Sequence, residues 1–255
     1  MNQSQILIMF YILVTLFGIV IGSFLNVCIF RIPLKEDIAL ERSHCMHCGH
    51  VLSWYELIPL FSFLIQGGKC RACKKKISIQ YPLVEALNGV LWLAVALVWG
   101  ICWETLIFCL ASSVLIVISV IDLRTREIPF SLNIALAVLG AARLALDYTH
   151  WYEYVIGFGA VSILLLLIIL ISKGKAMGGG DAKLMAAAGL LLGWKGIILS
   201  FVLGCVLGSV IHLTVMAVKK SKDHTLAFGP YLSLGIYLSI LFGMPIINWY
   251  TGFFQ

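Results

Sequence analysis

Charged residues are scarce in this sequence. Only 12% of its 255 residues are Asp, Glu, Lys or Arg, whereas 61% are hydrophobic, and the mean hydropathy is +1.02. A typical soluble domain carries about 25% charged residues. The shortage of charge excludes an ordinary soluble protein and predicts a polytopic membrane protein.

Processing signals, internal repeats and low-complexity tracts are also missing. The first apolar run has no basic segment before it and no small-residue cleavage site, and it continues to about Phe30. A secretory signal peptide would have both features. We therefore expect this run to be retained as the first membrane span.

Long apolar runs occupy most of the chain. Each is close to the ~20 residues that an α-helix needs to cross a ~30 Å hydrocarbon core. Their approximate bounds are 6–29, 83–103, 105–122, 128–146, 152–172, 177–194, 197–218 and 226–247. The sequence thus predicts an all-α polytopic membrane protein with about eight transmembrane helices. Between the first two lies one long polar stretch.

Basic residues are divided unequally between the two sides of this arrangement. When the polar stretch is placed in the cytoplasm, only Arg143 and Lys195 of the 18 Lys and Arg residues lie outside, which leaves 16 inside. This bias follows the positive-inside rule and predicts that both termini face outward. Topology and anionic lipid then account for the net charge of +6, so no nucleic-acid partner is expected.

Two aspartates fall inside predicted spans, near the cytoplasmic edge. In GGGDAKL (178–184) a helix that began after Lys183 would have about 11 residues before Trp194, roughly 16 Å, which is too short to cross. The helix must therefore include Asp181. The span in VISVIDLRTREIPF (117–130) must likewise include Asp122 to be long enough. An ionisable group at this depth costs several kcal/mol unless it has a partner or a water-filled cavity.

Two such carboxylates can act as an acid and a base. Carboxylates brought close together share one proton, because two like charges cannot both ionise there. One then activates water and the other protonates a leaving amine, which is the chemistry of an aspartyl protease. The three glycines before Asp181 disfavour a helix and let another backbone approach closely, which suits an extended substrate.

Each aspartate also has a structural interpretation. Asp181 could cap a helix N-terminus, and Asp122 could pair with Arg124 or Arg126 at a helix end. Intramembrane carboxylates are equally typical of a proton-coupled transporter. Location alone leaves these alternatives open.

The polar stretch contains four cysteines in two pairs. Two residues separate Cys45 from Cys48 and Cys70 from Cys73, and 21 residues lie between the pairs. This spacing is typical of a tetrathiolate zinc site. Two disulfides or a redox pair are the alternatives, but a cytoplasmic location would keep the thiols reduced. No H-E-x-x-H motif occurs, so we expect a structural zinc ion that stabilises a small domain.

Six features, in this order, resemble the type IV prepilin leader peptidases. They are GSFLNVCIFRIP (22–33), the paired cysteines with LSWYELIPLFS (52–62) between them, ISIQYPLVEAL (77–87), DLRTREIP (122–129), GGGDAKL (178–184) and FGPYLSLG (228–235). The resemblance covers nearly the whole chain. It implies that Asp122 and Asp181 are the catalytic pair, and the motif at Asp181 is also similar to the G-x-G-D signature of intramembrane aspartyl proteases.

The resemblance also implies a substrate and a location. Such enzymes cut the basic leader from prepilins or pilin-like secretion and competence proteins in the bacterial cytoplasmic (inner) membrane, with an active site that faces the cytoplasm. Many members then methylate the new amino terminus with S-adenosylmethionine, an activity associated with the cysteine-bearing loop. No Gly-rich nucleotide-binding motif identifies contacts to this methyl donor.

On this basis we expect three parts in the chain. They are a first transmembrane helix (1–30), a zinc-binding, methyltransferase-associated cytoplasmic domain (31–82) and a transmembrane aspartyl peptidase domain (83–255). A proton-coupled transporter with a structural zinc lobe is the alternative function. A zinc-containing membrane sensor or scaffold would leave the two aspartates without a role.

Overall fold

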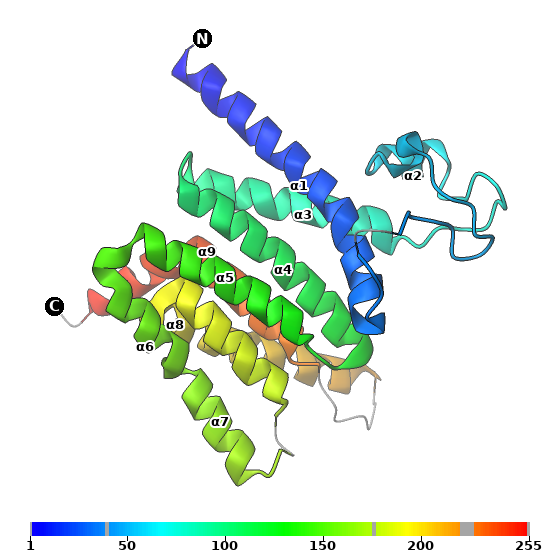
Figure 1. The fold of residues 1–255 in the computed structure, drawn as a ribbon. Coiled ribbons are helices and arrows are strands. Elements are labelled where there is room, and N and C mark those ends of the chain that lie inside the picture. The colour runs from blue at the N-terminus through cyan, green and yellow to red at the C-terminus, as the bar shows by residue number, and fades with distance from the viewer. Residues whose placement is uncertain (1, 39–40, 175–176, 220–226, 254–255) are drawn as a thin grey trace. The chain divides into compact units, whose positions relative to one another are not determined.

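Helices make up nearly all of the regular structure. The computed structural model describes residues 2–38, 41–174, 177–219 and 227–253. In these ranges the only β-pairing consists of two isolated bridges, His44 with Val51 and Lys69 with Lys76. The helices are α1 (Gln3–Leu34), η1 (Trp54–Leu57), α2 (Phe61–Ile65), α3 (Gln80–Trp99), α4 (Trp103–Thr125), α5 (Phe130–Leu146), η2 (Tyr148–His150), α6 (Trp151–Ala160), α7 (Ser162–Ile171), α8 (Gly179–Lys219) and α9 (Gly229–Thr251) (Figure 1).

Six helical segments of the described residues are long and apolar enough to cross a membrane. They are Gln3–Leu34, Gln80–Trp99, Trp103–Thr125, Tyr148–Ile171, Gly179–Thr214 and Gly229–Thr251, and α5 is a shorter apolar helix. The segment Tyr148–Ile171 combines η2, α6 and α7. These helices confirm the predicted all-α polytopic membrane fold, in which the cysteine-bearing stretch lies between α1 and α3.

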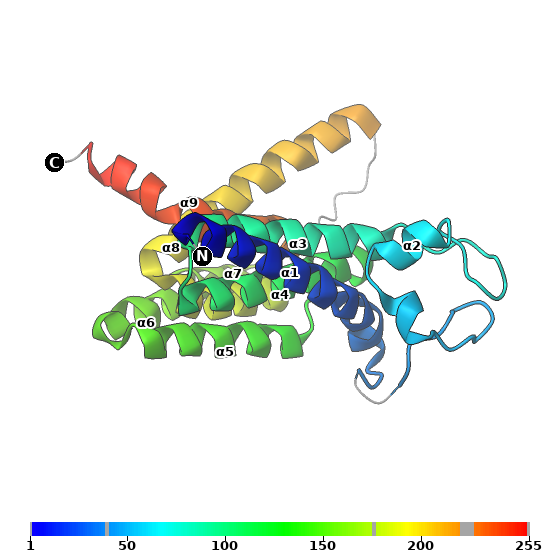
Figure 2. The ribbon, with the colours of Figure 1, turned by 90° about the horizontal axis from the view of Figure 1, so that it is seen from above.

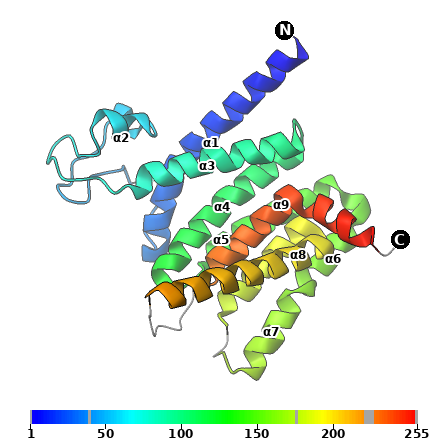
Figure 3. The same ribbon diagram turned by 180° about the vertical axis from the view of Figure 1, so that it is seen from behind.

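The long helix α8 is two helices joined at Gly193. Its 41 residues would extend for about 60 Å as one straight helix, twice the thickness of a hydrocarbon core. Gly193 has φ 72° and ψ 174°, values that interrupt the helix and favour glycine. The two parts run in different directions (Figures 2 and 3). They correspond to the two spans predicted at 177–194 and 197–218.

The chain divides into two compact units, Met1–Val117 and Ile118–Gln255. In the first unit α1 packs closely on α3, since a Cβ atom on Gly22 would lie 2.7 Å from the Cα atom of Glu85. A chain of buried hydrogen bonds joins three helices there. Asn88 donates to the Gly18 carbonyl at 2.6 Å, and Ser113 links Asn88 at 2.8 Å to Trp92 at 2.9 Å.

In the second unit α8 is the central helix. It packs against α5, α6, α7 and α9. Glycines again permit close contact, because a Cβ atom on Gly140 of α5 would lie 2.7 Å from the Cβ atom of Leu190. Small residues at helix contacts are typical of membrane proteins, where close packing replaces the hydrophobic effect. This unit contains both of the predicted catalytic aspartates.

Candidate active site and metal site

Asp122 lies near the end of α4 and is held by the start of α9. Its side chain is buried, with the residue 5% exposed, and its Oδ2 atom accepts a hydrogen bond of 2.9 Å from the backbone N–H of Gly229. A Cβ atom on Gly229 would lie only 2.8 Å from that oxygen and 3.0 Å from Cγ. A side chain at this position would therefore force the carboxylate or the start of α9 to shift. Arg124 and Arg126, the alternative partners considered above, are exposed.

Asp181 lies in the first turn of α8, which begins at Gly179. The residue is 8% exposed, and its backbone N–H donates to the Gly178 carbonyl at 3.2 Å. The prediction that this helix includes Asp181 is confirmed. The expectation that all three glycines resist helix formation is wrong for Gly179 and Gly180, because both belong to the helix. A carboxylate in a first helical turn is stabilised by the helix dipole.

The two carboxylates belong to one site. Asp122 interacts electrostatically with Asp181. The segments that carry them also touch, because a Cβ atom on Gly180 would lie 3.1 Å from the Cβ atom of Ile128, just before α5. The end of α4 and the start of α8 thus bring together two buried acids that are far apart in the sequence.

Two more buried polar side chains lie close by in the fold. Asn133 is in the first turn of α5 and Ser233 in the second turn of α9, and each is 3% exposed. Neither the two polar atoms of the Asn133 amide nor Ser233 Oγ has a hydrogen-bond partner among the described residues. An unsatisfied buried group of this kind costs about 1–3 kcal/mol. We did not select either residue from the sequence, although a lone polar residue at the start of an apolar span near an aspartate was an available signal.

The helix register places both groups about one turn from the acids. Ile128 lies opposite Gly180, and Gly140 lies opposite Leu190, so α5 runs alongside the first part of α8 in the same direction. By this register Asn133 lies about one turn further along than Asp181. Ser233 is four residues after Gly229 and therefore on the same face of α9.

The four predicted cysteine ligands also come together. The Sγ atoms of Cys45, Cys48, Cys70 and Cys73 all lie within 4.8 Å of one another, and those of Cys45 and Cys73 are 3.9 Å apart. Zinc–sulfur bonds of about 2.3 Å in a tetrahedron separate the sulfurs by about 3.8 Å. All eight cysteines of the chain are free thiols. The cluster can therefore hold a metal ion such as zinc.

Each cysteine pair is shaped by the same backbone turn. The N–H group of Gly49 donates to the Cys45 carbonyl, and that of Lys74 donates to the Cys70 carbonyl, both at 2.9 Å. Gly49 and Lys74 both have positive φ angles, 70° and 60°. The two pairs thus share one type of backbone turn, and each turn brings its two thiols to the same side, where the four sulfurs meet.

A buried carboxylate supports the first of these turns. Glu56 Oε2 accepts a hydrogen bond of 2.9 Å from the Ser53 N–H and lies 3.2 Å from His50 Nε2. These interactions, the Ser53 bond foremost, hold the pKa of Glu56 below its usual value. His50 is thus paired with a carboxylate and is not part of the thiol cluster.

Comparisons with known proteins cover both units. Residues 16–99 match the bacterial peptidase A24 N-terminal domain, and residues 109–213 match the type IV leader peptidase family. The chain is 35% identical to a prepilin leader peptidase/N-methyltransferase of Bacillus subtilis, over 92% of this chain and 95% of that protein. Proteins of the same name from Aeromonas hydrophila and Legionella pneumophila are 32% and 30% identical, over 95% and 96% of this chain and 94% and 96% of their own. No solved structure matches it.

Proposed function

The chain belongs to the type IV leader peptidase family, and from this premise we propose that Asp122 and Asp181 cut the leader from prepilins or pilin-like proteins. The observation that carries the proposal is the buried pair itself, with Asp122 fixed by the Gly229 N–H at 2.9 Å and Asp181 buried in the turn of α8 whose Gly180 packs against Ile128. Cleavage of prepilins and N-methylation are the activities in the names of its relatives. The family and the relatives do not support the alternative function, a proton-coupled transporter.

The proposed reaction uses the pair as one base and one acid. The ionised carboxylate takes a proton from water as the water oxygen attacks the scissile carbonyl carbon. The protonated carboxyl group polarises the carbonyl oxygen. The pair then delivers a proton to the amide nitrogen, the C–N bond breaks, and the leader leaves as a carboxylic acid. The Gly229 N–H occupies Oδ2 of Asp122, so we assign the contact with water to Oδ1.

Asn133 and Ser233 are proposed to bind the substrate backbone. A peptide that is cut must be extended at the scissile bond, and its N–H and C=O groups then need partners where little water is present. The unpartnered amide of Asn133 offers a donor and an acceptor, and Ser233 Oγ offers either. Bound substrate would satisfy groups that are otherwise costly to bury.

The thiol cluster is proposed to hold a structural zinc ion. Cys45, Cys48, Cys70 and Cys73 would close the coordination shell and stabilise the turns that carry them. The stretch 31–82 would then be the domain associated with methyl transfer from S-adenosylmethionine, between a first transmembrane helix (1–30) and the peptidase domain (83–255). The methyl donor is proposed from the relatives' names alone.

The proposed location is the bacterial inner membrane, with the active site facing the cytoplasm. The distribution of basic residues supports this orientation. In this orientation the end of α4 and the start of α8, which carry the acids, face the cytoplasm, where the basic leader of a prepilin lies. Topology reporters fused to the N-terminus and to the C-terminus should both report a location outside the cytoplasm.

Substitution of the two acids tests the function. We expect Asp122→Asn and Asp181→Asn each to abolish leader cleavage of a prepilin in membranes that contain the full chain, because each keeps its shape but loses its acid. Protein level and folding must match wild type. If both variants still cut the leader, the aspartates are structural and the proposed mechanism is wrong.

A further inference from the structure

The short helix α2 exposes large apolar side chains in the middle of the polar stretch. Phe61, Leu64 and Ile65 are 64%, 72% and 83% exposed. Contiguous exposed apolar side chains of this size usually mark a protein or membrane contact. The helix is only five residues long. Because these three side chains are exposed, they do not pack within the domain.

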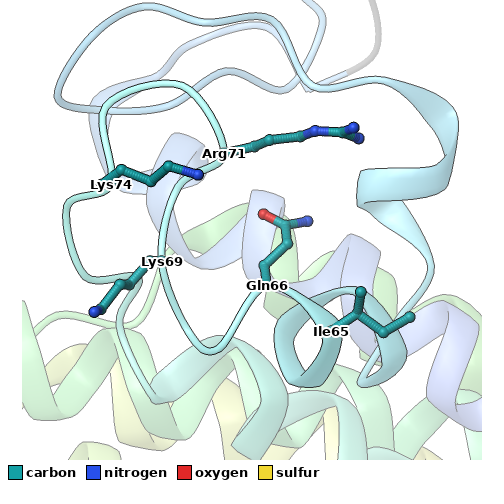
Figure 4. Close-up of a pocket in the computed structure, with 5 residues that line it drawn as sticks. All are labelled: Ile65, Gln66, Lys69, Arg71 and Lys74. Carbon is teal, nitrogen blue, oxygen red and sulfur yellow. The ribbon is translucent and has the colours of Figure 1, made fainter.

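A cationic cavity lies beside this helix. It has a volume of about 410 Å³ and is lined by Ile65, Gln66, Lys69, Arg71 and Lys74. Figure 4 shows the three cations on the loop after α2 and Gln66 and Ile65 at the end of the helix. No acidic residue lines the cavity. Its charge therefore suits an anion, and its apolar border suits an anion that carries a hydrocarbon chain.

The start of α2 is fixed to a membrane-spanning helix. The Leu60 N–H, directly before α2, donates a hydrogen bond of 2.8 Å to Glu85 Oε2. Glu85 is buried in the second turn of α3, about 7 Å from the start of that helix. Leu83 and Leu87, at the same level of α3, are themselves exposed, as lipid-facing residues should be. The hydrogen bond thus holds the start of α2 beside the second turn of α3, a helix long and apolar enough to cross the membrane.

We propose that α2 and its cavity dock on the membrane surface and bind the phosphate of an anionic phospholipid. Phe61, Leu64 and Ile65 insert at the boundary of the acyl chains, as in interfacial amphipathic segments. Lys69, Arg71 and Lys74 hold the headgroup phosphate, with Gln66 as a neutral donor. We call these seven residues the docking patch. The patch keeps the thiol cluster, which shares its loops, at the membrane surface.

Footprinting tests the insertion of the apolar residues. The full chain is reconstituted in nanodiscs that contain phosphatidylglycerol, labelled with hydroxyl radicals and analysed by mass spectrometry. We expect Phe61, Leu64 and Ile65 to be labelled several-fold more slowly than their exposure requires. Met46, 72% exposed in the same domain, is the internal control and should be labelled as its exposure requires. Equal labelling of α2 and Met46 would overturn the proposal.

Matched charge variants test the headgroup site. Lys69→Gln/Lys74→Gln removes two cations from the cavity, whereas Lys75→Gln/Lys76→Gln removes two from the same loop outside it. Bound phosphatidylglycerol is measured by native mass spectrometry, after equal melting temperatures and zinc contents are established. We expect binding about 30-fold weaker in the first variant, at about fivefold for each cation lost. The second variant should bind like wild type, because its two lysines do not line the cavity.

Two results would contradict the headgroup site. If both double variants lose lipid equally, the loop attracts lipid through its total charge and the cavity has no special role. If inorganic phosphate displaces phosphatidylglycerol at similar concentration, the cavity is a site for soluble anions and not a membrane contact. Neither test uses peptidase activity, so each is independent of the function proposed above.

Discussion

The contact between Gly229 and Asp122 makes a quantitative prediction about one methyl group. In Gly229→Ala the added Cβ atom would lie 2.8 Å from Asp122 Oδ2, whereas ordinary contact begins at 3.4 Å. To restore ordinary contact, the carboxylate or the start of α9 must therefore move by about 0.6 Å, the difference between these distances. The movement also weakens the hydrogen bond that orients the carboxylate.

Such a shift should reduce cleavage strongly and stability moderately. A displacement of about 1 Å at a reacting group can lower the rate about 100-fold, so a shift of 0.6 Å should lower it about 10- to 100-fold. Overpacking of this kind destabilises by about 1–3 kcal/mol, which leaves the folded state populated in a protein of ordinary stability. The loss should appear in kcat rather than in KM, because the methyl group acts on the carboxylate.

Two other glycines serve as graded controls. A Cβ atom on Gly179 would meet no atom within 4 Å, although Gly179 is only two residues from Asp181, whereas one on Gly180 would lie 3.1 Å from Ile128. We expect Gly179→Ala to cut like wild type and to keep wild-type stability, since Gly179 is the first residue of α8 and the added Cβ atom meets no other atom. Gly180→Ala should lose a few-fold in rate.

The assay is leader cleavage of a purified prepilin by each variant in nanodiscs, with thermal unfolding measured in parallel. The expected order of activity is Gly179→Ala, then Gly180→Ala, then Gly229→Ala. Wild-type rates for Gly229→Ala would refute the reasoning that this backbone contact sets the position of Asp122. An inactive but stable Gly179→Ala would show instead that the space beside Gly179 belongs to the substrate.

Three further predictions concern other parts of the chain. Asn133→Leu and Ser233→Ala should raise KM for prepilin about tenfold each while unfolding temperature stays equal or rises, because buried unpartnered groups are removed; a fall in stability with unchanged KM would contradict substrate binding. If the thiol cluster holds the proposed zinc ion, its removal by a chelator, or Cys70→Ser, should unfold the cysteine-bearing domain, seen as rapid proteolysis between α1 and α3, while leader cleavage persists. Since the folded pKa of Glu56 is lowered, its stabilisation is present above the usual Glu pKa of about 4.3 and is lost as pH falls through the folded value. Thermal unfolding of Glu56→Gln should thus change less than that of wild type between about pH 6 and pH 3.

The membrane fold could be predicted because it depends on local properties of the sequence. Hydropathy and the length of a helical crossing predicted about eight spans. Among the described residues, six helical segments are long and apolar enough to cross, α5 is shorter, and the kinked α8 contains two of the predicted spans. Length alone placed Asp181 inside a helix. The structure has α8 begin at Gly179, in agreement with that argument. The expectation that the glycine run resists a helix was wrong because propensity is a weak preference, and the packing of α8 against α5 and α6 outweighs it.

The contacts across the fold could not be predicted in the same way. The hydrogen bond between Gly229 and Asp122 joins residues that are 107 positions apart. Nothing in the sequence Phe228–Gly229–Pro230 indicates that a carboxylate accepts this bond. The Leu60–Glu85 bond has the same character. That the Asn133 amide has no hydrogen-bond partner could not be predicted either, because it depends on which residues pack around it. The thiol cluster could be predicted from sequence spacing, because the two cysteines of each pair are brought together by a local turn. Only the contact between the two turns depends on the fold.

The depth of the two acids explains how one site can combine water with low polarity. Asp122 is in the last turn of α4 and Asp181 in the first turn of α8, so both lie where a span ends, and yet both are at least nine-tenths buried. A pair in the middle of the spans would lack water for hydrolysis, and a pair in a loop would be solvated too well to share a proton. Gly229, at the start of α9, gives the buried Asp122 carboxylate a hydrogen-bond donor. A side chain at this position would lie too close to the carboxylate. Substitution of the acids therefore tests the function itself, and substitution of Gly229 tests how Asp122 is positioned for it.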